Sequence, residues 1–299
     1  MVMTTKEFTQ LYSKDFNSVF FDDYTRQPEE GLRILKPITM DGAYDRGGEL
    51  AGLGVMPEIT AENQPIGYDK FIQGLEKIIT PKEYGLALQI SRIMIEDDKV
   101  GHMRSAVREI GKSAAYTREV LAHDVLNSGF VTTARVGMDT LALFSASHTR
   151  LDGGTVRSNL ATGTLTQSNL QTGINLFELL KNDRGIPIAM KPDLLIVGPA
   201  LQFKAEELLK SQYQPETGNN AVNSTNKFGL TYMVDHYLSL STAWFLLSTK
   251  SHKLNWYWKR KVTLTQTVDH NTDAALYKGT FRAVPDFRYW QGVVGSTGV

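Results

Sequence analysis

One long amphipathic helix is the feature that most constrains how this sequence can fold. Over residues 100–128, apolar or small side chains recur at spacings of three and four, at Met103, Val107, Ile110, Ala114, Thr117, Leu121 and Val125. This spacing places them on one continuous face of an α-helix. Asp97 and Asp98 can cap its start, and Asn127 and Gly129 end it. At about 1.5 Å per residue the helix would span about 43 Å, which is typical of a structural spine.

Further helices and strands follow this spine helix in mixed order. Thr166 can cap a helix whose apolar face is Leu170, Ile174, Phe177 and Leu180, and helical spacing recurs over residues 200–213. Apolar or β-branched runs predict strands at 193–199, 230–234, 243–248, 254–266, 275–284 and 286–295. The sequence therefore predicts an α+β fold. With 299 residues, the chain reaches the size at which a single hydrophobic core stops growing, so we expect two lobes.

The segment before the spine helix predicts a loop followed by a charged β-hairpin. Residues 41–65 are rich in glycine, which is typical of a loop. Two partly alternating runs, 68–79 and 84–90, then flank a break that contains Pro81. We therefore expect a hairpin over about 66–90. Because an isolated two-stranded hairpin is only marginally stable in water, this one would be better supported if it lay across another subunit.

The first 35 residues show no clear repeat. They contain an aromatic cluster made of Phe16, Phe20, Phe21 and Tyr24, together with Val19. Two interpretations remain open: a short helix packed on the chain's own core, or an arm whose aromatic side chains bind a neighbouring subunit. No apolar run follows a basic start at the N-terminus, so we expect no secretory signal. No stretch approaches the roughly 20 apolar residues of a membrane span.

Charge and cysteine content exclude several classes of protein. Lys and Arg number 32, as do Asp and Glu, which gives a net charge of zero. A dedicated DNA-binding protein usually carries a basic excess, so this balance argues against one and is compatible with a wall that encloses DNA without adhering to it. Little long-range repulsion would oppose self-association. The absence of cysteine excludes disulfides, thiolate metal sites and cysteine nucleophiles.

The sequence contains no motif for catalysis, cofactor binding or metal binding. It lacks a phosphate-binding P-loop, a Gly-x-Gly-x-x-Gly turn and a His-Glu-x-x-His helix. Ser145-Ala-Ser147-His148 places serine beside histidine, but without the flanking glycines of a nucleophile elbow, so we interpret it as a turn held by hydroxyl–backbone bonds. The six histidines lack ligand spacing, and Glu96 with its two following aspartates is interpreted as helix-start charge. We therefore predict no enzyme, no cofactor and no metal.

Short motifs in a fixed order carry a resemblance to a known family. They lie at residues 86–98, 143–148, 165–166, 192–199, 234–238, 244–246, 286–288 and 295–296. An arm, a glycine-rich loop, a charged hairpin, a spine helix, a mixed α/β segment and long terminal strands follow one another along the chain. This order resembles the tailed-bacteriophage major capsid proteins of the Hong Kong 97 type, and within that group the chain is most similar to the Mu-like major head subunits.

The resemblance implies a domain plan and a set of partners. It implies an N-terminal arm at 1–35, a glycine-rich loop and extended hairpin loop at 36–92, a peripheral domain at 93–164, an axial domain at 165–270, and C-terminal strands returning to the peripheral domain at 271–299. The implied partners are other copies in pentamers and hexamers, a separate scaffolding protein, a portal, and packaged double-stranded DNA held by weak non-specific contact, with no membrane. The implied location is the virion, after assembly in the cytoplasm of a bacterial host.

The expected functional residues are contacts between subunits. They are Phe16, Phe20, Phe21, Tyr68, Lys70, Phe71, Glu76, Lys77, Lys82, Glu83 and Tyr84. Some family members link a hairpin lysine covalently to a neighbour's asparagine; here we interpret the hairpin lysines as solvated or ion-paired. Two alternatives stay open. Encapsulin shells share this fold and hold cargo enzymes instead of DNA, and a soluble α+β enzyme with an undetected site would have no shell at all.

Overall fold

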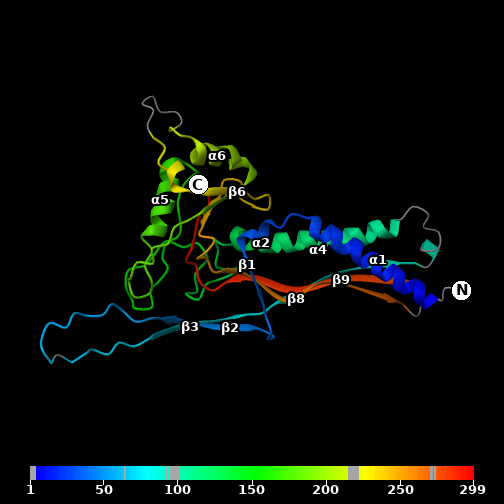
Figure 1. Ribbon diagram of the computed structural model, residues 1–299, viewed down its shortest axis with the longest axis horizontal. Coiled ribbons are helices and arrows are strands. Elements are labelled where there is room, and N and C mark those ends of the chain that lie inside the picture. Colours follow the sequence, from blue (N-terminus) through cyan, green and yellow to red (C-terminus); the bar gives the residue numbers. More distant parts are fainter. Residues whose placement is uncertain are drawn as a thin grey trace. The chain divides into compact units, whose positions relative to one another are not determined.

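The computed structural model describes residues 5–63, 65–91, 93–94, 102–214, 222–269, 272 and 274–299 (Figure 1). The chain divides into two compact units, each built from three separate segments. Unit 1 comprises residues 1–44, 80–122 and 256–285, and unit 2 comprises 45–79, 123–255 and 286–299. The boundary at residue 256 differs from the end of the expected axial domain at residue 270. Among the described helices, none is both long and apolar enough to cross a lipid bilayer.

Unit 1 packs helices on one face of a four-stranded sheet. Its strands lie in the order β1 (Lys36–Thr39), β8 (Leu254–Val268), β9 (Ala275–Phe287) and β4 (Lys82–Ile90). Strand β4 is antiparallel to β9, with Lys82 opposite Ala283 and Ile90 opposite Ala275. Helices α1 (Thr5–Arg26) and α4 (His102–Asn127) cover one face, and the short helix α2 (Glu30–Ile34) leads into β1 (Figure 1).

Two glycines allow the close packing of unit 1. A Cβ atom on Gly111 of α4 would lie 2.7 Å from the carbonyl oxygen of Phe20, and one on Gly279 of β9 would lie 2.8 Å from Ile110. Both distances are too short for a real contact. Glycine at these positions therefore lets α1 and β9 approach α4.

The N-terminal segment forms a helix of 22 residues, which is longer than either interpretation of the sequence expected. Phe16, Phe20 and Asp23 are buried at helical spacing, whereas Phe21 is 39% exposed. A buried carboxylate and an exposed aromatic ring together obscure the helical pattern in the sequence. Phe16 and Phe20 pack inside their own unit, and this burial argues against their expected role as contacts to a neighbour, which stays a prediction.

The predicted spine helix is confirmed as α4, with 26 residues. Its buried positions include Val107, Ile110, Ala115, Arg118, Ala122 and Val125. Leu121, which the sequence pattern placed on this face, is only half-buried. The buried face therefore departs from the predicted one in the second half of the helix, where a charged residue occupies it. The capping residues Asp97 and Asp98 lie outside the described residues.

Unit 2 contains a second four-stranded sheet that is buried on both faces. Its strands lie in the order β10 (Val293–Ser296), β7 (Trp244–Leu247), β5 (Leu194–Val197) and β6 (Thr231–Val234), and only β5 and β6 pair in parallel. Helices α5 (Gln167–Glu178) and α6 (Gln202–Lys210) share a core with one face, while Phe130 and Phe144 stack near Phe245 of β7. Burial on both faces explains why β5 and β7 are continuous apolar runs.

The helices and strands predicted beyond the spine helix are confirmed with shifted ends, except the strand expected at 286–295. Its first two residues end β9, and strand structure resumes only in β10, at 293–296. The hydroxyl of Thr166 accepts a hydrogen bond from the Asn169 backbone N–H at 3.3 Å, as expected of a capping residue. Two 3₁₀ turns, η1 (Pro199–Leu201) and η2 (Asn226–Phe228), complete unit 2.

The hairpin differs from the prediction. Strand β2 (Asp45–Ala51) pairs with β3 (Ile72–Ile79), whereas β4 pairs with β9. The expected hairpin over 66–90 is therefore wrong: the hairpin runs from residue 45 to 79, and the break at Pro81 is where the chain passes from one sheet to another. Glycine lowers strand propensity, so β2 was predicted as loop. A Cβ on Gly47 would lie 2.5 Å from the guanidinium carbon of Arg288, so a larger residue there would displace the end of this arginine.

Candidate assembly surfaces

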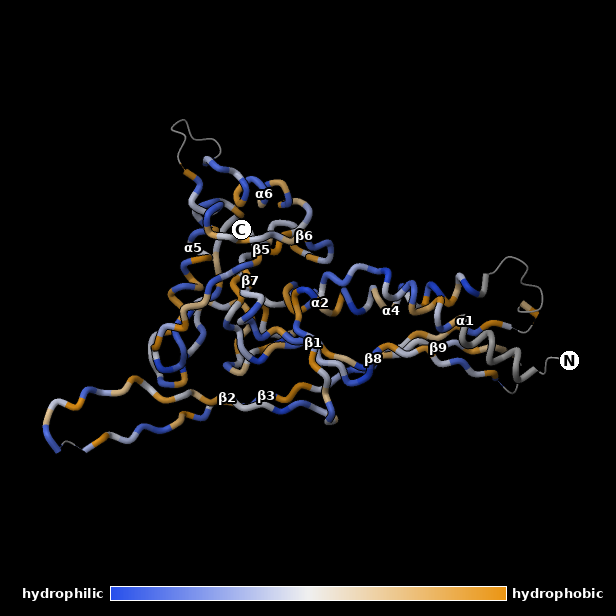
Figure 2. Tube along the Cα trace, viewed as in Figure 1, coloured by the Kyte–Doolittle hydropathy of each residue, from blue (hydrophilic) through white to orange (hydrophobic). Residues whose placement is uncertain are grey.

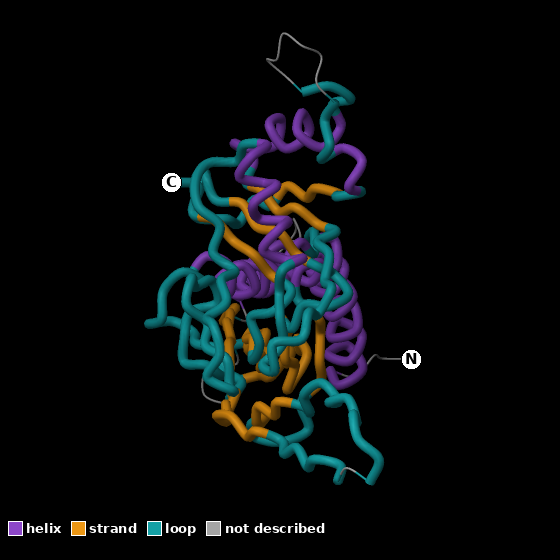
Figure 3. Tube along the Cα trace, turned by 90° about the vertical axis from the view of Figure 1, so that its left-hand side faces the viewer, coloured by secondary structure: helices purple, strands orange, loops and turns teal. Residues whose placement is uncertain are grey.

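The end of the β2–β3 hairpin exposes many apolar side chains. We define the hairpin tip as residues 52–71, in which the described residues form loop (Figure 3). Apolar segments recur along it (Figure 2). Its exposed apolar residues are Leu53, Val55, Met56, Ile59, Ile66, Tyr68 and Phe71, and Met56 is 92% exposed. Monomeric proteins rarely expose large contiguous apolar patches, and larger ones mark interaction sites. The hairpin tip therefore has the character of a surface that another molecule covers.

Lys77 fixes the root of this hairpin inside unit 2. Its buried ammonium lies 2.6 Å from the carboxylate of Asp286 and donates to the carbonyl oxygens of Val136 at 2.7 Å and Phe287 at 2.6 Å. Burial lowers the pKa of Lys77, and the neighbouring carboxylate of Asp286 opposes this shift. Lys77 is thus an internal anchor, which argues against its expected role as a contact to a neighbour; that role stays a prediction.

A second anchor closes the base of the hairpin tip. Arg184 donates to the carbonyl oxygen of Gly52 at 2.8 Å and to the carboxylate of Asp69 at 3.0 Å. The same carboxylate accepts the backbone N–H of Gly54 at 2.7 Å. Backbone hydrogen bonds from Gly54 and Lys70, helped by Arg184, hold the pKa of Asp69 below its usual range. One arginine and one aspartate therefore tie the two ends of the tip together.

The other predicted contacts remain at least partly exposed and lie on both units. Tyr68, Lys70, Phe71 and Glu76 belong to the hairpin of unit 2, and Lys82, Glu83 and Tyr84 belong to strand β4 of unit 1, as Phe21 does to α1. Glu76 pairs with Arg46, Glu83 with Arg260, and the ring of Tyr84 stacks on Phe281 with centroids 5.1 Å apart. The first half of the hairpin tip was not among the predicted contacts, because its glycines predict only a loop. The sequence sign of an interaction surface there is the set of apolar residues between those glycines.

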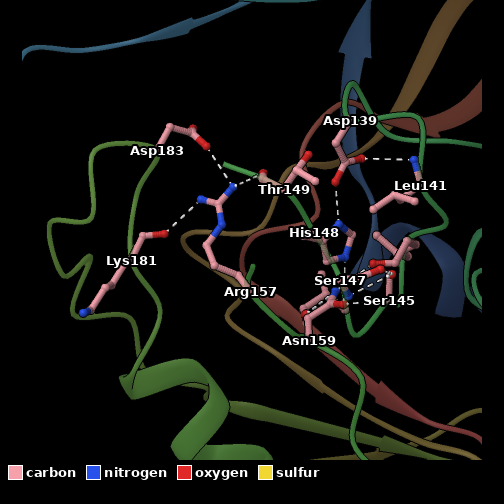
Figure 4. Close-up of polar contacts among 12 residues, drawn as sticks. Asp139, Leu141, Ser145, Ser147, His148, Thr149, Arg157, Asn159, Lys181 and Asp183 are labelled. Atoms are coloured by element: carbon pink, nitrogen blue, oxygen red, sulfur yellow. Dashed lines mark hydrogen bonds and ion pairs between the residues drawn. The ribbon is translucent and has the colours of Figure 1, made fainter. Parts of the chain in front are cut away.

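The segment Ser145–His148 is an irregular bend in which Ser147 is exposed and only His148 is buried. The backbone N–H of Ser147 donates to the Ser145 hydroxyl at 3.2 Å, which confirms the predicted hydroxyl–backbone bond. His148 is fully buried, with Nδ1 2.5 Å from the Asp139 carboxylate and Nε2 3.0 Å from the side-chain oxygen of Asn159 (Figure 4). Both ring nitrogens thus contact groups other than serine, and the histidine serves to join three loop segments.

Arg157 ties a neighbouring pair of segments together. Its guanidinium donates to the carbonyl oxygens of Thr149 at 2.8 Å and Lys181 at 3.0 Å, and to the carboxylate of Asp183 at 2.8 Å (Figure 4). It also lies over the ring of Trp290, 5.2 Å from the ring centroid. These contacts hold the loop at 181–185, which carries Arg184, in a fixed place in unit 2.

Glu49 on β2 is a buried carboxyl group at the hairpin root. It is 9% exposed, and a Cβ on Gly74 of β3 would lie 2.9 Å from its carboxyl oxygen. Burial, together with the nearby carboxylates of Asp183 and Asp139, raises the pKa of Glu49 to about 7, and the guanidinium of Arg157 opposes this shift. At acidic pH the folded hairpin root therefore holds this group in its neutral form.

This raised pKa makes the stability of unit 2 depend on pH. Between the ordinary pKa of a glutamate and about pH 7, the folded state binds more protons than the unfolded state, so stability falls as pH rises through this window. Glu49→Gln should remove this slope and stabilise the chain by about 1–2 kcal/mol at pH 8, after discounting for solvent screening. Urea unfolding at pH 5 and pH 8 measures the free energy of unfolding of the unmodified chain and of the variant. The same change with pH in both would contradict the raised pKa of Glu49.

Comparison with known proteins fits this architecture. A family model described as phage capsid protein matches residues 74–296. The chain belongs to this phage capsid protein family. Among curated protein sequences nothing matches it. Because the match begins in β3 and ends in β10, it includes the spine helix and every strand of the two four-stranded sheets except β1.

Solved shell structures share the fold of this capsid protein. The procapsid of bacteriophage JBD30 is similar with a TM-score of 0.53 and 19% identity, over 98% of this chain and 76% of that chain. The mature capsid of bacteriophage PhiM1 is similar with a TM-score of 0.61 and 10% identity, over 90% of this chain and 87% of that one. An encapsulin from Synechococcus elongatus reaches 0.55 with 8% identity, over 92% and 89%.

Family and fold together confirm the predicted Hong Kong 97-type capsid fold and a shell-forming major capsid protein. They indicate a structural role and a component of the virion. The encapsulin match shows that the fold also serves shells of another kind.

Proposed function

We propose that this capsid protein builds an icosahedral head that encloses double-stranded DNA, and that the hairpin tip joins neighbouring copies. The observation that carries the proposal is the exposed apolar tip on a root fixed by Lys77 and Arg184. A tip that served its own unit would bury its apolar side chains there. An exposed apolar ribbon with a fixed root is suited to bind the same surface on each successive copy.

The energetics favour apolar contact over ion pairs in this assembly. Exposed ion pairs contribute at most about 1 kcal/mol each. Apolar surface contributes roughly 25 cal/mol per Å² removed from water, against the cost of ordering loops. Because both ends of the tip are already tied together by Asp69 and Arg184, part of that ordering is complete before assembly.

The remaining features of the expected domain plan and partners belong to this proposal. Peripheral and axial domains, pentamers and hexamers, a separate scaffolding protein, a portal and weak contact with packaged DNA all follow from a head that is filled with a genome. Assembly in the host cytoplasm is part of the same proposal. The partly exposed residues Phe21, Lys82, Glu83 and Tyr84 would add contacts from unit 1.

A substitution set confined to the hairpin tip tests its role. Replacing Val55, Met56, Ile59 and Ile66 by serine should leave a folded, soluble subunit but reduce closed particles at least tenfold, because the apolar contact is lost. Electron microscopy counts the particles, and circular dichroism checks the fold. A matched variant with Thr60, Ala61 and Asn63 replaced by serine should assemble normally. Particles of normal number and size from the first variant would refute the role of the tip.

The encapsulin match favours one second candidate, a compartment that holds protein cargo. The contents of purified particles separate the two functions. A head should yield protected double-stranded DNA after nuclease treatment when made in infected cells, whereas a cargo compartment should yield a co-purifying protein and no genome-length DNA.

A further inference from the structure

A small cavity in unit 2 has an apolar wall and a basic rim. It lies between the end of α5 and the loop at 150–158 and has a volume of about 290 Å³. Leu176, Leu179 and Val156 form its apolar wall, and Leu179 is 75% exposed. Sites for small molecules usually measure about 300–1,000 Å³. This cavity is therefore suited to one or two side chains of a passing segment.

The described part of the chain does not supply a partner for every basic group that lines this cavity. Arg150 pairs with Asp152, and Arg157 pairs with Asp183. The Nε–H groups of both arginines are buried and find no acceptor among the described residues. The third basic group, Lys181, is exposed, and its ammonium has no ion-pair partner in the described part of the chain. The buried Nε–H groups are out of reach of a partner, so the exposed ammonium of Lys181 is the group that favours a carboxylate beside the apolar wall.

The hairpin tip carries the complementary chemistry. Glu58 and Glu62 are exposed and have no ion-pair partner among the residues that the structure describes. Glu58 follows the exposed residues Val55 and Met56 and precedes Ile59, so a carboxylate stands between apolar side chains. The segment at 55–62 thus combines a carboxylate with apolar side chains, which complements the cavity's exposed lysine and apolar wall.

We propose that this cavity receives residues 55–62 of the hairpin tip of a second copy. The carboxylate of Glu58 or Glu62 would bind Lys181, and Met56 or Ile59 would pack against Leu179 and Val156. The inference rests on the proposed function, in which the tip joins copies, and adds the surface that the tip meets. Each copy offers one tip and one cavity, so the contact is heterologous and can repeat around a closed ring.

A charge swap tests this pairing under the conditions in which the unmodified chain assembles. Lys181→Glu should reduce closed particles at least tenfold, because it places like charges together. Glu58→Lys or Glu62→Lys in the same chain should then restore them. Lys191→Glu, at an exposed lysine that does not line the cavity, should assemble normally. Normal assembly of Lys181→Glu, or failure of both second substitutions to restore particles, would overturn the proposal.

Disulfide trapping gives an independent reading, because the chain has no cysteine of its own. Particles that carry Glu58→Cys with Lys181→Cys should give a ladder of linked chains on non-reducing gels after mild oxidation. Glu58→Cys with Lys191→Cys should give single chains. A faster-migrating single chain from the first pair would show that the tip reaches the cavity of its own copy, which overturns the proposal, as would the absence of any disulfide.

The two experiments separate this inference from the proposed function. If the serine variant of the tip fails to assemble while the Glu58 and Lys181 cysteine pair forms no ladder, the tip joins copies at another surface. If the serine variant assembles normally, the proposed role of the tip and this inference both fail.

Discussion

Arg118→Met is expected to destabilise the unassembled subunit by about 3–5 kcal/mol, because it leaves a buried carboxylate without its partner. Arg118 and Glu119 are each only 1% exposed, and the Arg118 Nε donates to the Glu119 carboxylate at 3.0 Å. The guanidinium also donates to the hydroxyl of Tyr24 at 2.9 Å and to the carboxylate of Glu29 at 2.8 Å. One side chain of the spine helix thus joins α4 to the N-terminal segment.

A double substitution separates the loss of the ion pair from the cost of leaving the buried Glu119 carboxylate unpaired. Glu119 accepts the backbone N–H of Gly31 at 2.7 Å, and glutamine can keep this bond without a charge. Arg118→Met with Glu119→Gln should therefore lose clearly less stability than Arg118→Met alone. Urea unfolding followed by tryptophan fluorescence measures both. Lys112→Met, on the exposed side of the same helix, should leave the midpoint unchanged; a single variant as stable as the unmodified chain would contradict this account.

Lys77→Met is expected to have the second large effect, a loss of about 3–5 kcal/mol at the hairpin root. Methionine fills a similar volume but leaves the carboxylate of Asp286 unpaired, and it abandons the carbonyl oxygens of Val136 and Phe287. Hydrogen exchange should show loss of protection in β2 and β3. Because the tip then lacks a fixed root, particle yield should fall as well.

Two further variants test whether the loss of stability in Lys77→Met comes from the unpaired carboxylate of Asp286. Lys77→Met with Asp286→Asn removes the uncompensated charge and should recover part of the stability. Lys82→Met, three residues after the end of β3 and exposed, should change neither exchange nor unfolding. Unchanged protection of β2 and β3 in Lys77→Met would show that backbone pairing alone holds the root.

Local patterns in the sequence predicted most elements of the fold. Helix α4 with the first half of its buried face, the cap at Thr166 and the buried strands β5 and β7 all follow from spacings between residues near one another in the chain. Pairing between strands did not follow. Alternation shows that 72–79 and 82–90 are strands, but it carries no information about partners, so the neighbouring runs were joined as a hairpin.

Some of the candidate contacts could be identified from the sequence, and others could be assigned only from the packing. Exposed Tyr68 and Phe71 could be selected from the sequence because they lie in an apolar and charged stretch without a helical face. Phe16 and Phe20 could not be told apart from Phe21, because all three are phenylalanines within one aromatic cluster. Only packing against β9 and α4 decides which rings are buried.

By itself, the sequence determined the α+β class, the spine helix, the absence of thiol chemistry and the resemblance to capsid proteins, because these depend on composition and on short-range periodicity. The tertiary structure alone decided that the hairpin begins at residue 45, that Lys77 is an anchor, and that the tip is the exposed surface. Those features depend on contacts between distant residues, such as Lys77 and Asp286, which lie 209 positions apart. Local spacing indicates a buried face in a regular helix or strand, but at positions such as Lys77 burial depends on residues that are distant in the sequence.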